Sequence, residues 1–309
     1  MMRSNDLSVQ QLHTFRDVYE QGGYAAAARE SGLSTPTVWQ HIQGLETLYG
    51  VPLFRKVGRR VCATPAADQL YSCLVELLVG LESTFDIVQP GNGKDDRDLI
   101  LVTGVRMMLE DLATPLSQFR EEFTQTKLHI IHGNNQRAEE LILAGEADLA
   151  LTLEPGFQQD SPMIQYEPAY SIEFLAVCPE SHPFAKVKKV TLKEIVKHDL
   201  IVTAPGTYGR DALDQALHKE GLKPKIAAET DNSGFTLACV EVGMGLGIVA
   251  GRPAGRLCRG LTVRSLRPHL GHRQIVFMWQ KGRRLTPALE SLINQVQGTL
   301  QDSKTKSTF

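Results

Sequence analysis

The sequence predicts an α/β protein that begins with an all-α-type module, a winged helix-turn-helix. Two observations carry this prediction. Residues 8–49 show helical spacing and are followed by a short basic stretch, and strand-length apolar runs alternate with helical patterns from residue 99 onward. The 309 residues have the length of about two domains. A composition of 42% hydrophobic and 22% charged residues excludes a collagen-like or wholly disordered chain.

Three helices are expected at the N-terminus. Residues 8–21 carry apolar side chains at helical spacing, and residues 24–31 are short and rich in alanine. Ser34 is a good N-cap for a third helix that ends at Tyr49, before Gly50. A helix, a short helix, a tight turn and a third helix make a helix-turn-helix, whose last helix enters the major groove of DNA.

A basic stretch follows the third helix. Residues 55–60 include four basic side chains, and residues 47–65 contain no acidic side chain. Val57-Gly58 is expected at the tip of a small β-wing, from which arginines reach phosphates or the minor groove. A solvated basic loop is the alternative, and the three preceding helices favour DNA binding. The net charge of −2 does not exclude it, since a larger acidic remainder dilutes a small basic patch.

Residues 66–90 predict one long acidic helix. Its apolar residues recur at spacings of four and three, a pattern close to that of a coiled-coil seam. Residues 66–88 contain no Lys or Arg. We expect a dimerisation helix; the alternative is an amphipathic helix packed on its own domain. The polar, glycine-containing residues 91–98 are expected to be a hinge linker. The seam consists of Leu70, Leu74, Leu77, Leu81 and Phe85.

Residues 99–300 predict parallel sheets with crossover helices, divided into two α/β lobes with a cleft between them. Lobe I is expected over about 99–169 and 273–300, and lobe II over about 170–272, with 301–309 as a tail. In open α/β sheets, ligands bind outside the carboxyl ends of the strands. The expected strands are 99–102, 127–132, 149–153, 172–177, 200–203 and 247–250, and the expected helices are 112–123, 136–144, 209–220 and 236–243.

The chain resembles the LysR-type transcriptional regulators over nearly its whole length. The resemblance implies a winged helix-turn-helix over 1–65, a linker helix that dimerises, and an effector-binding domain like the type 2 periplasmic binding proteins. The motifs that carry it are Phe15, Gly22, Ala27-Ala28, Leu33-Ser34, Pro36, Val38, Ile42, Leu45-Glu46, Gly50-Val51-Pro52-Leu53-Phe54, Arg59-Arg60, Thr64, Gly145–Leu151, His182-Pro183-Phe184 and Gly243–Val249.

Several positions depart from the family pattern. The family usually has Gln at the position of Thr35, Ser at that of Trp39 and Arg at that of Lys56. An Arg or other polar residue followed by Gln often stands where this chain has Gln40-His41, and a Ser or Thr cap where it has Gly23. These departures affect the DNA sequence that is read, and not the fold.

The predicted DNA contacts fall into two groups. Gln pairs bidentately with adenine and Thr contacts a thymine methyl group or a phosphate, so the outward face of the third helix is expected to read bases. The helix cap and the wing are expected to contact phosphates or the minor groove. The base-reading candidates are Thr35, Thr37, Gln40 and His41, and the backbone-contacting candidates are Ser34, Arg55, Lys56, Arg59 and Arg60.

The predicted effector site lies where strand ends and helix starts meet, which suits a small anion or polar metabolite. An ordinary helix cap is the alternative role for each threonine. Thr103 with Gly133, Thr203 and Gly209-Arg210 is similar to the sulfur-assimilation, CysB-like branch of the family. The candidates are Thr103, Arg106, Asn134, Gln136, Thr152, Thr203, Thr207 and Arg210.

Other kinds of site are not expected. The five cysteines are odd in number and never C-x-x-C, which argues against a disulfide framework or zinc; a lone redox-sensing cysteine is the alternative to core filler. His129 and His132 lie three apart in a strand and so face opposite sides. The glycines from Gly243 to Gly247 do not match G-x-G-x-x-G and lie between a helix and a strand. No cofactor and no metal are predicted.

Three function classes were weighed. The coupling of a DNA module, a dimer helix and a two-lobed domain favours a homodimeric or homotetrameric regulator that binds double-stranded promoter DNA and a small-molecule effector. A solute-binding protein is disfavoured by the N-terminal module and the lack of a signal peptide. An enzyme is disfavoured because no nucleophile elbow, P-loop or H-E-x-x-H occurs. No run approaches a membrane span, so a cytoplasmic protein is expected.

Overall fold

The computed structural model describes residues 7–58, 60–88, 98–155, 161–253 and 255–305. It divides into two compact units, one of Met1–Val88 with Lys281–Arg284 and one of Gln89–Gln280 with Leu285–Phe309. Residues 91–97 of the expected hinge linker lie outside the described residues.

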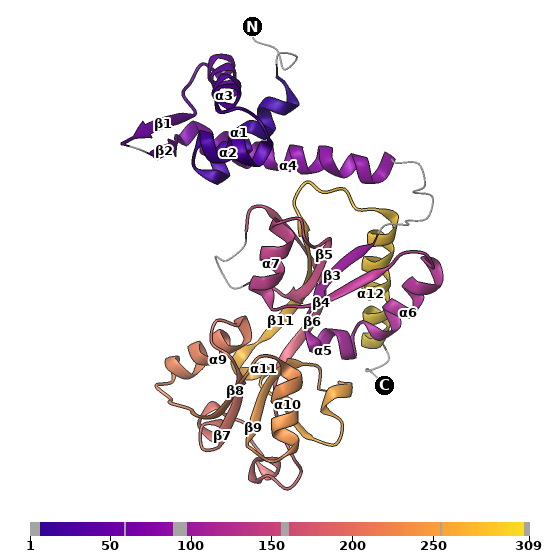
Figure 1. The fold of residues 1–309 in the computed structure, drawn as a ribbon. Coiled ribbons are helices and arrows are strands. Elements are labelled where there is room, and N and C mark those ends of the chain that lie inside the picture. The colour runs from indigo at the N-terminus through magenta and orange to yellow at the C-terminus, as the bar shows by residue number, and fades with distance from the viewer. Residues whose placement is uncertain (1–6, 59, 89–97, 156–160, 254, 306–309) are drawn as a thin grey trace. The chain divides into compact units, whose positions relative to one another are not determined.

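The N-terminal unit is built on three helices, α1 (Val9–Gln21), α2 (Tyr24–Ser31) and α3 (Thr35–Tyr49) (Figure 1). Each ends at a glycine with a left-handed backbone, a conformation that glycine adopts without a Cβ penalty. Ala27 is wholly buried, so α2 packs closely between its neighbours. These helices confirm the predicted helix-turn-helix. The core of the unit comprises Phe15, Val18, Ala27, Ala28, Val38, Ile42, Leu45, Leu53, Phe54, Ala67, Leu74 and Leu78.

A two-stranded wing follows, formed by β1 (Phe54–Val57) and β2 (Arg60–Ala63). The strands are antiparallel, and Val57 pairs with Arg60 across the turn. Arg59, one of the predicted backbone contacts, lies outside the described residues. Thr64 joins the wing to the next helix, because its hydroxyl donates to the Pro52 carbonyl at 2.8 Å and accepts from the Ala67 N–H at 3.3 Å.

The long helix α4 (Pro65–Val88) has two apolar faces. Leu74 and Leu78 belong to the core of the N-terminal unit, and Tyr71 stacks on Tyr19 of α1 with ring centroids 4.0 Å apart. By contrast, 69% of Leu77 and 63% of Phe85 are exposed. The seam expected from the sequence is therefore divided: its first part packs on its own unit, and its second part is bare.

The second unit contains one nine-stranded mixed sheet. Its order is β4-β3-β5-β11-β6-β9-β7-β8, with β10 paired to β6. Two parallel groups, β4-β3-β5 and β9-β7-β8, flank the antiparallel strands β11 and β6. The expectation of parallel sheets is therefore correct for the two outer groups and wrong for these two central strands, of which only residues 172–177 of β6 were expected. The strands are β3 (Leu99–Thr103), β4 (Leu128–His132), β5 (Leu149–Leu153), β6 (Ile164–Cys178), β7 (Asp199–Thr203), β8 (Lys225–Thr230), β9 (Leu246–Gly251), β10 (Thr262–Ser265) and β11 (His272–Gln280).

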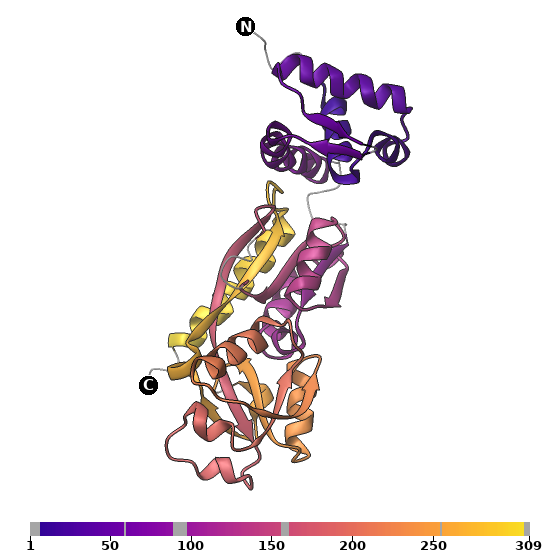
Figure 2. The same cartoon turned by 90° about the vertical axis from the view of Figure 1, so that its left-hand side faces the viewer.

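Helices cover both parallel groups. Figure 2 shows α12 lying along β6 and β11, where its apolar face completes a core with α6. The helices are α5 (Val105–Glu110), α6 (Ala113–Glu122), α7 (Asn135–Leu143), α8 (Leu192–Ile195), α9 (Tyr208–Lys219), α10 (Ser233–Glu241), α11 (Arg267–Leu270) and α12 (Pro287–Thr305), with 3-10 turns η2 (Pro183–Lys186) and η3 (Arg256–Cys258).

The second unit has two lobes, each with its own hydrophobic core. We call the part built on β3, β4 and β5 lobe I and the part built on β7, β8 and β9 lobe II. Strand β6 belongs to both, because Tyr170 and Ile172 lie in the lobe I core while Phe174 and Ala176 lie in the lobe II core. Its ladder with β11 shifts register between Ile275 and Val276.

A pair of histidines lies beside the lobe II core. The ring centroids of His182 and His198 are 5.1 Å apart, and the buried Nε2 atom of His198 has no hydrogen-bond partner in the described part of the chain. Burial, together with the neighbouring His198, lowers the pKa of His182. The His182 Nδ1 atom accepts from the Phe184 N–H at 3.2 Å, which also requires a neutral ring.

We expect acid to destabilise lobe II through His182. Since its pKa is lower in the folded than in the unfolded chain, stability is fully present above about pH 6.5 and falls as the pH decreases from there. His182→Asn keeps a cap acceptor and should flatten this dependence in thermal denaturation compared between about pH 8 and about pH 5.5. His218→Asn, at an exposed site of α9, should keep the wild-type dependence. Equal pH profiles for wild type and His182→Asn would refute the assignment.

Candidate functional site

The start of α3 presents the predicted DNA contacts. Ser34 caps the helix, and its Oγ accepts from the Thr37 N–H at 3.2 Å and lies 2.7 Å from the Thr37 hydroxyl. Both side chains are thus already engaged with each other. Thr35 and Gln40 are exposed, as is 52% of Trp39, so a row of free side chains remains along this face.

His41 is held by a hydrogen bond that also sets its tautomer. Its Nδ1 atom lies 2.8 Å from the hydroxyl of Thr14, a residue that is 2% exposed. The Thr14 hydroxyl donates its own proton to the Gln10 carbonyl at 2.8 Å, so it accepts from His41. The Nδ1 atom therefore carries a proton, and Nε2 of the neutral ring is an acceptor.

The wing supplies exposed positive charge. The side chains of Arg55, Lys56 and Arg60 are exposed, and none has an ion-pair partner within the residues that the structure describes. Arg60 lies on β2, beside the turn, while Arg55 and Lys56 lie on β1. Uncompensated cations on a protruding hairpin suit phosphate contacts.

Glu46 fixes the wing to α3, a role that the sequence did not reveal. Its Oε1 atom accepts from the backbone N–H groups of Leu53 and Phe54, at 2.8 and 3.1 Å, and its Oε2 accepts from Gln43 at 2.6 Å. The family resemblance includes this residue only as part of the Leu45-Glu46 motif. The bonds span seven and eight residues, so no helical or strand periodicity signals them.

Glu46→Ala is expected to lower the free energy of local opening of the N-terminal unit by about 2–3 kcal/mol, because two backbone donors lose a charged acceptor. Hydrogen–deuterium exchange of peptides from α3 and β1 in the full chain measures this change. Glu30→Ala removes an exposed carboxylate from α2 and should change protection by less than about 0.5 kcal/mol. Unchanged exchange in Glu46→Ala would show that these two bonds do not stabilise the wing.

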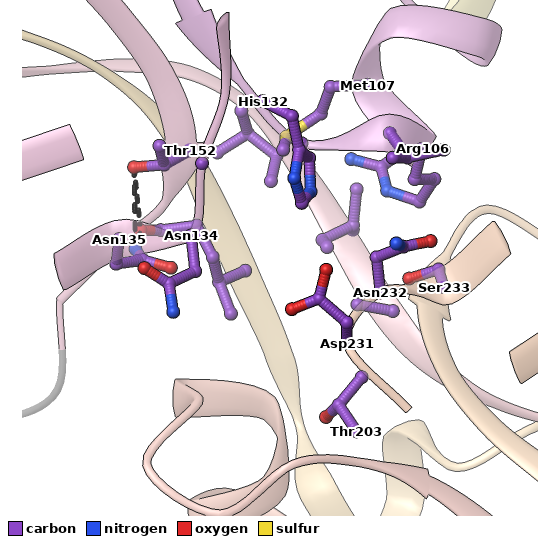
Figure 3. A pocket seen from close by; sticks show the side chains of 17 residues that line it. Arg106, Met107, His132, Asn134, Asn135, Thr152, Thr203, Asp231, Asn232 and Ser233 are labelled. Atoms are coloured by element: carbon purple, nitrogen blue, oxygen red, sulfur yellow. Dashed lines mark hydrogen bonds between the residues drawn. The ribbon is translucent and has the colours of Figure 1, made fainter. Parts of the chain in front are cut away.

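The second unit contains a polar cavity between its two lobes (Figure 3). The ends of β3, β4 and β5 reach it from lobe I, and the ends of β7 and β8 reach it from lobe II. These strands are parallel within each lobe, so their carboxyl ends meet at one place, where α/β proteins bind ligands. The cavity volume is about 130 Å³, and a second cavity of about 120 Å³ shares Asn135, Leu153, Thr203, Ser233 and Ala250 with it.

Six of the eight predicted effector residues line these two cavities. Arg106, Asn134, Thr152 and Thr203 line the first, and Thr207 and Arg210 join Thr203 in the second. Thr103 and Gln136 line neither. Thr103 is 2% exposed and its hydroxyl donates to the Leu151 carbonyl at 3.1 Å, within the sheet. Gln136 faces solvent and its amide donates to Glu140 at 3.3 Å.

Local hydrogen bonds orient the polar groups of lobe I. The Asn134 side chain caps α7 by accepting from the Arg137 N–H at 2.9 Å. The Asn135 amide donates to the Leu153 carbonyl and lies 3.4 Å from the Thr152 hydroxyl. These bonds tie the start of α7 to the end of β5, so this wall of the cavity is preformed.

Arg210 is positioned within lobe II. Its guanidinium donates to the Thr203 carbonyl at 3.1 Å, to Glu229 at 2.7 Å and to Asp214 at 2.8 Å. Two carboxylates therefore compensate its charge, and the hydroxyl of Thr207 lies 2.9 Å from that of Thr203. Arg210 builds the wall of the second cavity and is not a free cation within it.

A buried network of charges joins the lobes beside the first cavity. Asp111 follows α5 of lobe I and accepts from Arg106 at 2.7 Å, from the Tyr170 hydroxyl and from Arg252, which follows β9 of lobe II. Glu110 accepts from the Leu257 N–H of lobe II at 2.9 Å. Burial and the Asp111 carboxylate raise the pKa of Tyr170, so its phenol stays protonated as a donor. We call Arg106, Glu110, Asp111, Tyr170 and Arg252 the interlobe network.

Sequence reasoning missed several residues that line the cavity. Asn135 stands beside the predicted Asn134, and His132 was considered only as a metal ligand. Asp231, Asn232 and Ser233 follow β8, a strand that was not expected, so its end was not considered. The signal that was present is the cap residue Asn232, which precedes α10 and accepts from two of its N–H groups.

We also searched the described part of the chain for metal sites, a dinucleotide-binding turn, reactive cysteines and membrane-spanning helices. No group of three or more His, Cys, Asp or Glu side chains there is arranged to hold a metal ion. Residues 243–247 lead from the end of α10 into the start of β9, and this order of helix and strand is the reverse of a dinucleotide-binding turn. Burial and the nearby Glu110 raise the pKa of the Cys258 thiol to about 11. Within residues 7–58, 60–88, 98–155, 161–253 and 255–305, no helix is long and apolar enough to cross a bilayer.

A helix-turn-helix with a basic wing, joined to a two-lobed α/β domain with a polar cavity, defines a DNA-binding regulator with an effector domain. The comparisons with known proteins agree. Residues 9–68 match the bacterial regulatory helix-turn-helix proteins of the LysR family, and residues 103–301 match the LysR substrate binding domain. The chain therefore belongs to the LysR family of transcriptional regulators.

Curated relatives support the CysB-like branch. The chain is 27% identical over 249 residues to the HTH-type transcriptional regulator CysB of Haemophilus influenzae, covering 79% of this chain and 76% of that protein. It is 27% identical over 246 residues to the regulator SsuR of Burkholderia cenocepacia, covering 79% of both. Its fold resembles the cofactor-binding domain of the Cbl transcriptional regulator, with a TM-score of 0.60 and 22% identity over 71% of this chain and 96% of that one.

Proposed function

We propose that the protein is a homo-oligomeric, cytoplasmic regulator whose binding to a promoter operator is controlled by a small polar or anionic metabolite. In this proposal residues 1–65 bind DNA, 66–90 dimerise, 91–98 form a hinge and 99–300 bind the effector. The convergence of five strand ends from two lobes on a polar cavity, in a chain with a winged helix-turn-helix, carries the proposal.

We assign base reading to the exposed face of α3 and backbone contacts to its cap and to the wing. Thr35, Gln40 and the Nε2 atom of His41 are available to base edges, and Thr37 stands one turn from His41. Ser34 and the wing residues Arg55, Lys56, Arg59 and Arg60 are assigned to phosphates or the minor groove.

We assign effector binding to the residues that line the two cavities, and regulation to a population shift. An effector that binds one arrangement of the lobes better than another will favour that arrangement. The lobes are already joined by the interlobe network, so a ligand that engages Arg106 acts directly on groups that hold both lobes. The proposed effector residues are Arg106, Asn134, Thr152, Thr203, Thr207 and Arg210, and no contact with the effector is assigned to Thr103 or Gln136, which line neither cavity.

Fluorescence anisotropy tests the proposal with the full chain and its own upstream intergenic DNA. We expect selective binding relative to scrambled DNA, weakening as salt rises. A footprint that changes when a metabolite extract is added, and that does not change after Thr203→Val, would link the cavity to DNA binding. Equal binding to both DNAs would refute an operator in that region, and selection from random DNA would then decide whether any operator exists.

We expect the wing and α3 to differ in how they affect DNA binding. Lys56→Ala should weaken binding to all sequences and reduce the slope of log affinity against log salt by about 1. Gln40→Ala should weaken the free energy of binding to the operator by about 1–3 kcal/mol and relax the preference at one base pair, with little change in the salt slope. Anisotropy titrations over a salt series measure both. If Lys56→Ala changed sequence preference, its assignment to the backbone would be wrong.

A further inference from the structure

The cavity between the lobes has hydrogen-bond donors on one side and a carboxylate on the other. Arg106 and His132 come from lobe I, and Asp231 follows β8 of lobe II. In Figure 3 the carboxylate of Asp231 and the imidazole of His132 both point into the cavity, and Arg106 lies at its edge beside Asn232 and Ser233. A ligand in this space therefore meets a carboxylate on one side and donors on the other.

Arg106 has one guanidinium nitrogen that finds no acceptor among the described residues. Its Nη1 atom is bound to Asp111 at 2.7 Å and lies 3.3 Å from Glu110. Only 7% of the side chain is exposed, and its buried Nη2 atom makes no hydrogen bond of regular geometry with any described residue. The Tyr170 phenol also lies beside the guanidinium. A buried guanidinium N–H without an acceptor is costly, and a small turn of the Arg106 side chain would bring it to a ligand oxygen in the cavity that this residue lines.

Asp231 is the one acidic side chain that lines this cavity among the described residues. It is exposed, and no hydrogen bond or ion pair of its carboxylate occurs within that part of the chain. Its neighbour Asn232 is committed to α10, because its Oδ1 accepts from Gly234 and Phe235 at 2.9 and 3.2 Å. A simple oxyanion would be repelled by Asp231, whereas an ammonium group would be attracted to it.

We propose that the effector is a small zwitterion that carries a carboxylate and a protonated amine, as an α-amino acid does. Its carboxylate accepts from the Nη2 atom of Arg106, and its amine donates to the carboxylate of Asp231. This inference rests on the proposed effector function of the same cavity. The volumes of about 130 and 120 Å³ lie below the range of about 300–1,000 Å³ for drug-sized ligands, which also favours a small molecule.

Isothermal titration calorimetry of the full chain tests the ligand class. The twenty protein amino acids are screened at about 10 mM, and L-alanine and the best binder are compared with L-lactate, L-alaninamide and sulfate. Lactate lacks the amine, alaninamide lacks the carboxylate, and sulfate is a simple oxyanion. We expect the best amino acid to bind at least about tenfold more tightly than any of these three probes.

Two matched variants locate the amine. Asp231→Asn should weaken the amino acid at least about tenfold while leaving lactate and sulfate equal or tighter. Glu220→Gln makes the same charge change at an exposed residue of lobe II that lines neither cavity, and it should bind like the wild type. Thermal unfolding of each variant shows whether it is folded.

The outcomes separate this inference from the proposed function. Lactate or sulfate binding as tightly as any amino acid, or unchanged amino acid binding in Asp231→Asn, would overturn the zwitterion and leave an anion-binding effector cavity. No binding by any of the twenty amino acids would overturn the zwitterion class as well. Selective operator binding, measured on the same preparation, reports the regulatory function independently.

Discussion

Asp111→Ala is expected to lower the free energy of unfolding of the second unit by about 3–5 kcal/mol, because it leaves a buried cation without its main counter-charge. The Asp111 side chain is completely buried and accepts from Arg106, Arg252 and the Tyr170 hydroxyl. After the substitution Arg106 retains Glu110, at 3.3 Å, as its ion-pair partner among the described residues, and the Tyr170 phenol loses its acceptor. The link to Arg252 between the lobes is lost as well.

Urea denaturation monitored by circular dichroism measures the effect. Asp199→Ala is the matched control, since Asp199 is 44% exposed and pairs with the exposed Lys225, and it should cost less than about 1 kcal/mol. Asp111→Asn separates charge from hydrogen bonding, because the amide keeps an acceptor oxygen. Equal losses for Asp111→Ala and Asp199→Ala would mean that the interlobe network contributes no more than a surface ion pair.

Leu77→Glu is expected to dissociate the proposed oligomer and to weaken operator binding by about 100-fold, because two linked DNA-binding modules bind with far higher avidity than one. Leu77, Leu81 and Phe85 form an apolar ridge at four-residue spacing on α4, and 69% of Leu77 is exposed. A glutamate in this ridge would lie in an apolar contact between two copies, close to Glu76 and Glu82.

Ser72→Glu provides the control, since Ser72 is exposed on another face of α4 and its substitution introduces the same charge. Sedimentation velocity gives the oligomeric state of both variants, and anisotropy gives their affinity for the same DNA. A Leu77→Glu protein that sedimented like the wild type would show that the ridge is not the dimer contact, and α4 would then be an amphipathic helix of its own unit.

The parts of the fold that could be predicted have local signals. Gly22, Gly32 and Gly50 mark the ends of three helices, and the start of the third is marked by Ser34. Strands β3 and β5 are continuous apolar runs, which identified them directly. Strand β8 was missed because its residues alternate between exposed and half-buried positions and include charged side chains. The polar first half of β6 was missed for a similar reason.

The candidate site shows the same division. Asn134, Thr152 and Thr203 could be predicted because they follow or end strands that were recognised. Asp231 could not, because the strand before it was not recognised. Glu46 and Asp111 act on groups that are distant in the sequence, such as Phe54 and Arg252, and spacing alone carries no information about such partners.

The continuity of β6 limits how the lobes can move. A loop hinge allows wide opening by rotation about a few single bonds, whereas an unbroken strand of 15 residues bends and twists only over its whole length. The register shift opposite Ile275 and Val276 is the point where the ladder is least regular and where extra twist is easiest. We therefore expect an effector to produce a small torsional displacement with a steep elastic cost, so that occupancy of the cavity changes an angle of a few degrees rather than opening a wide gap.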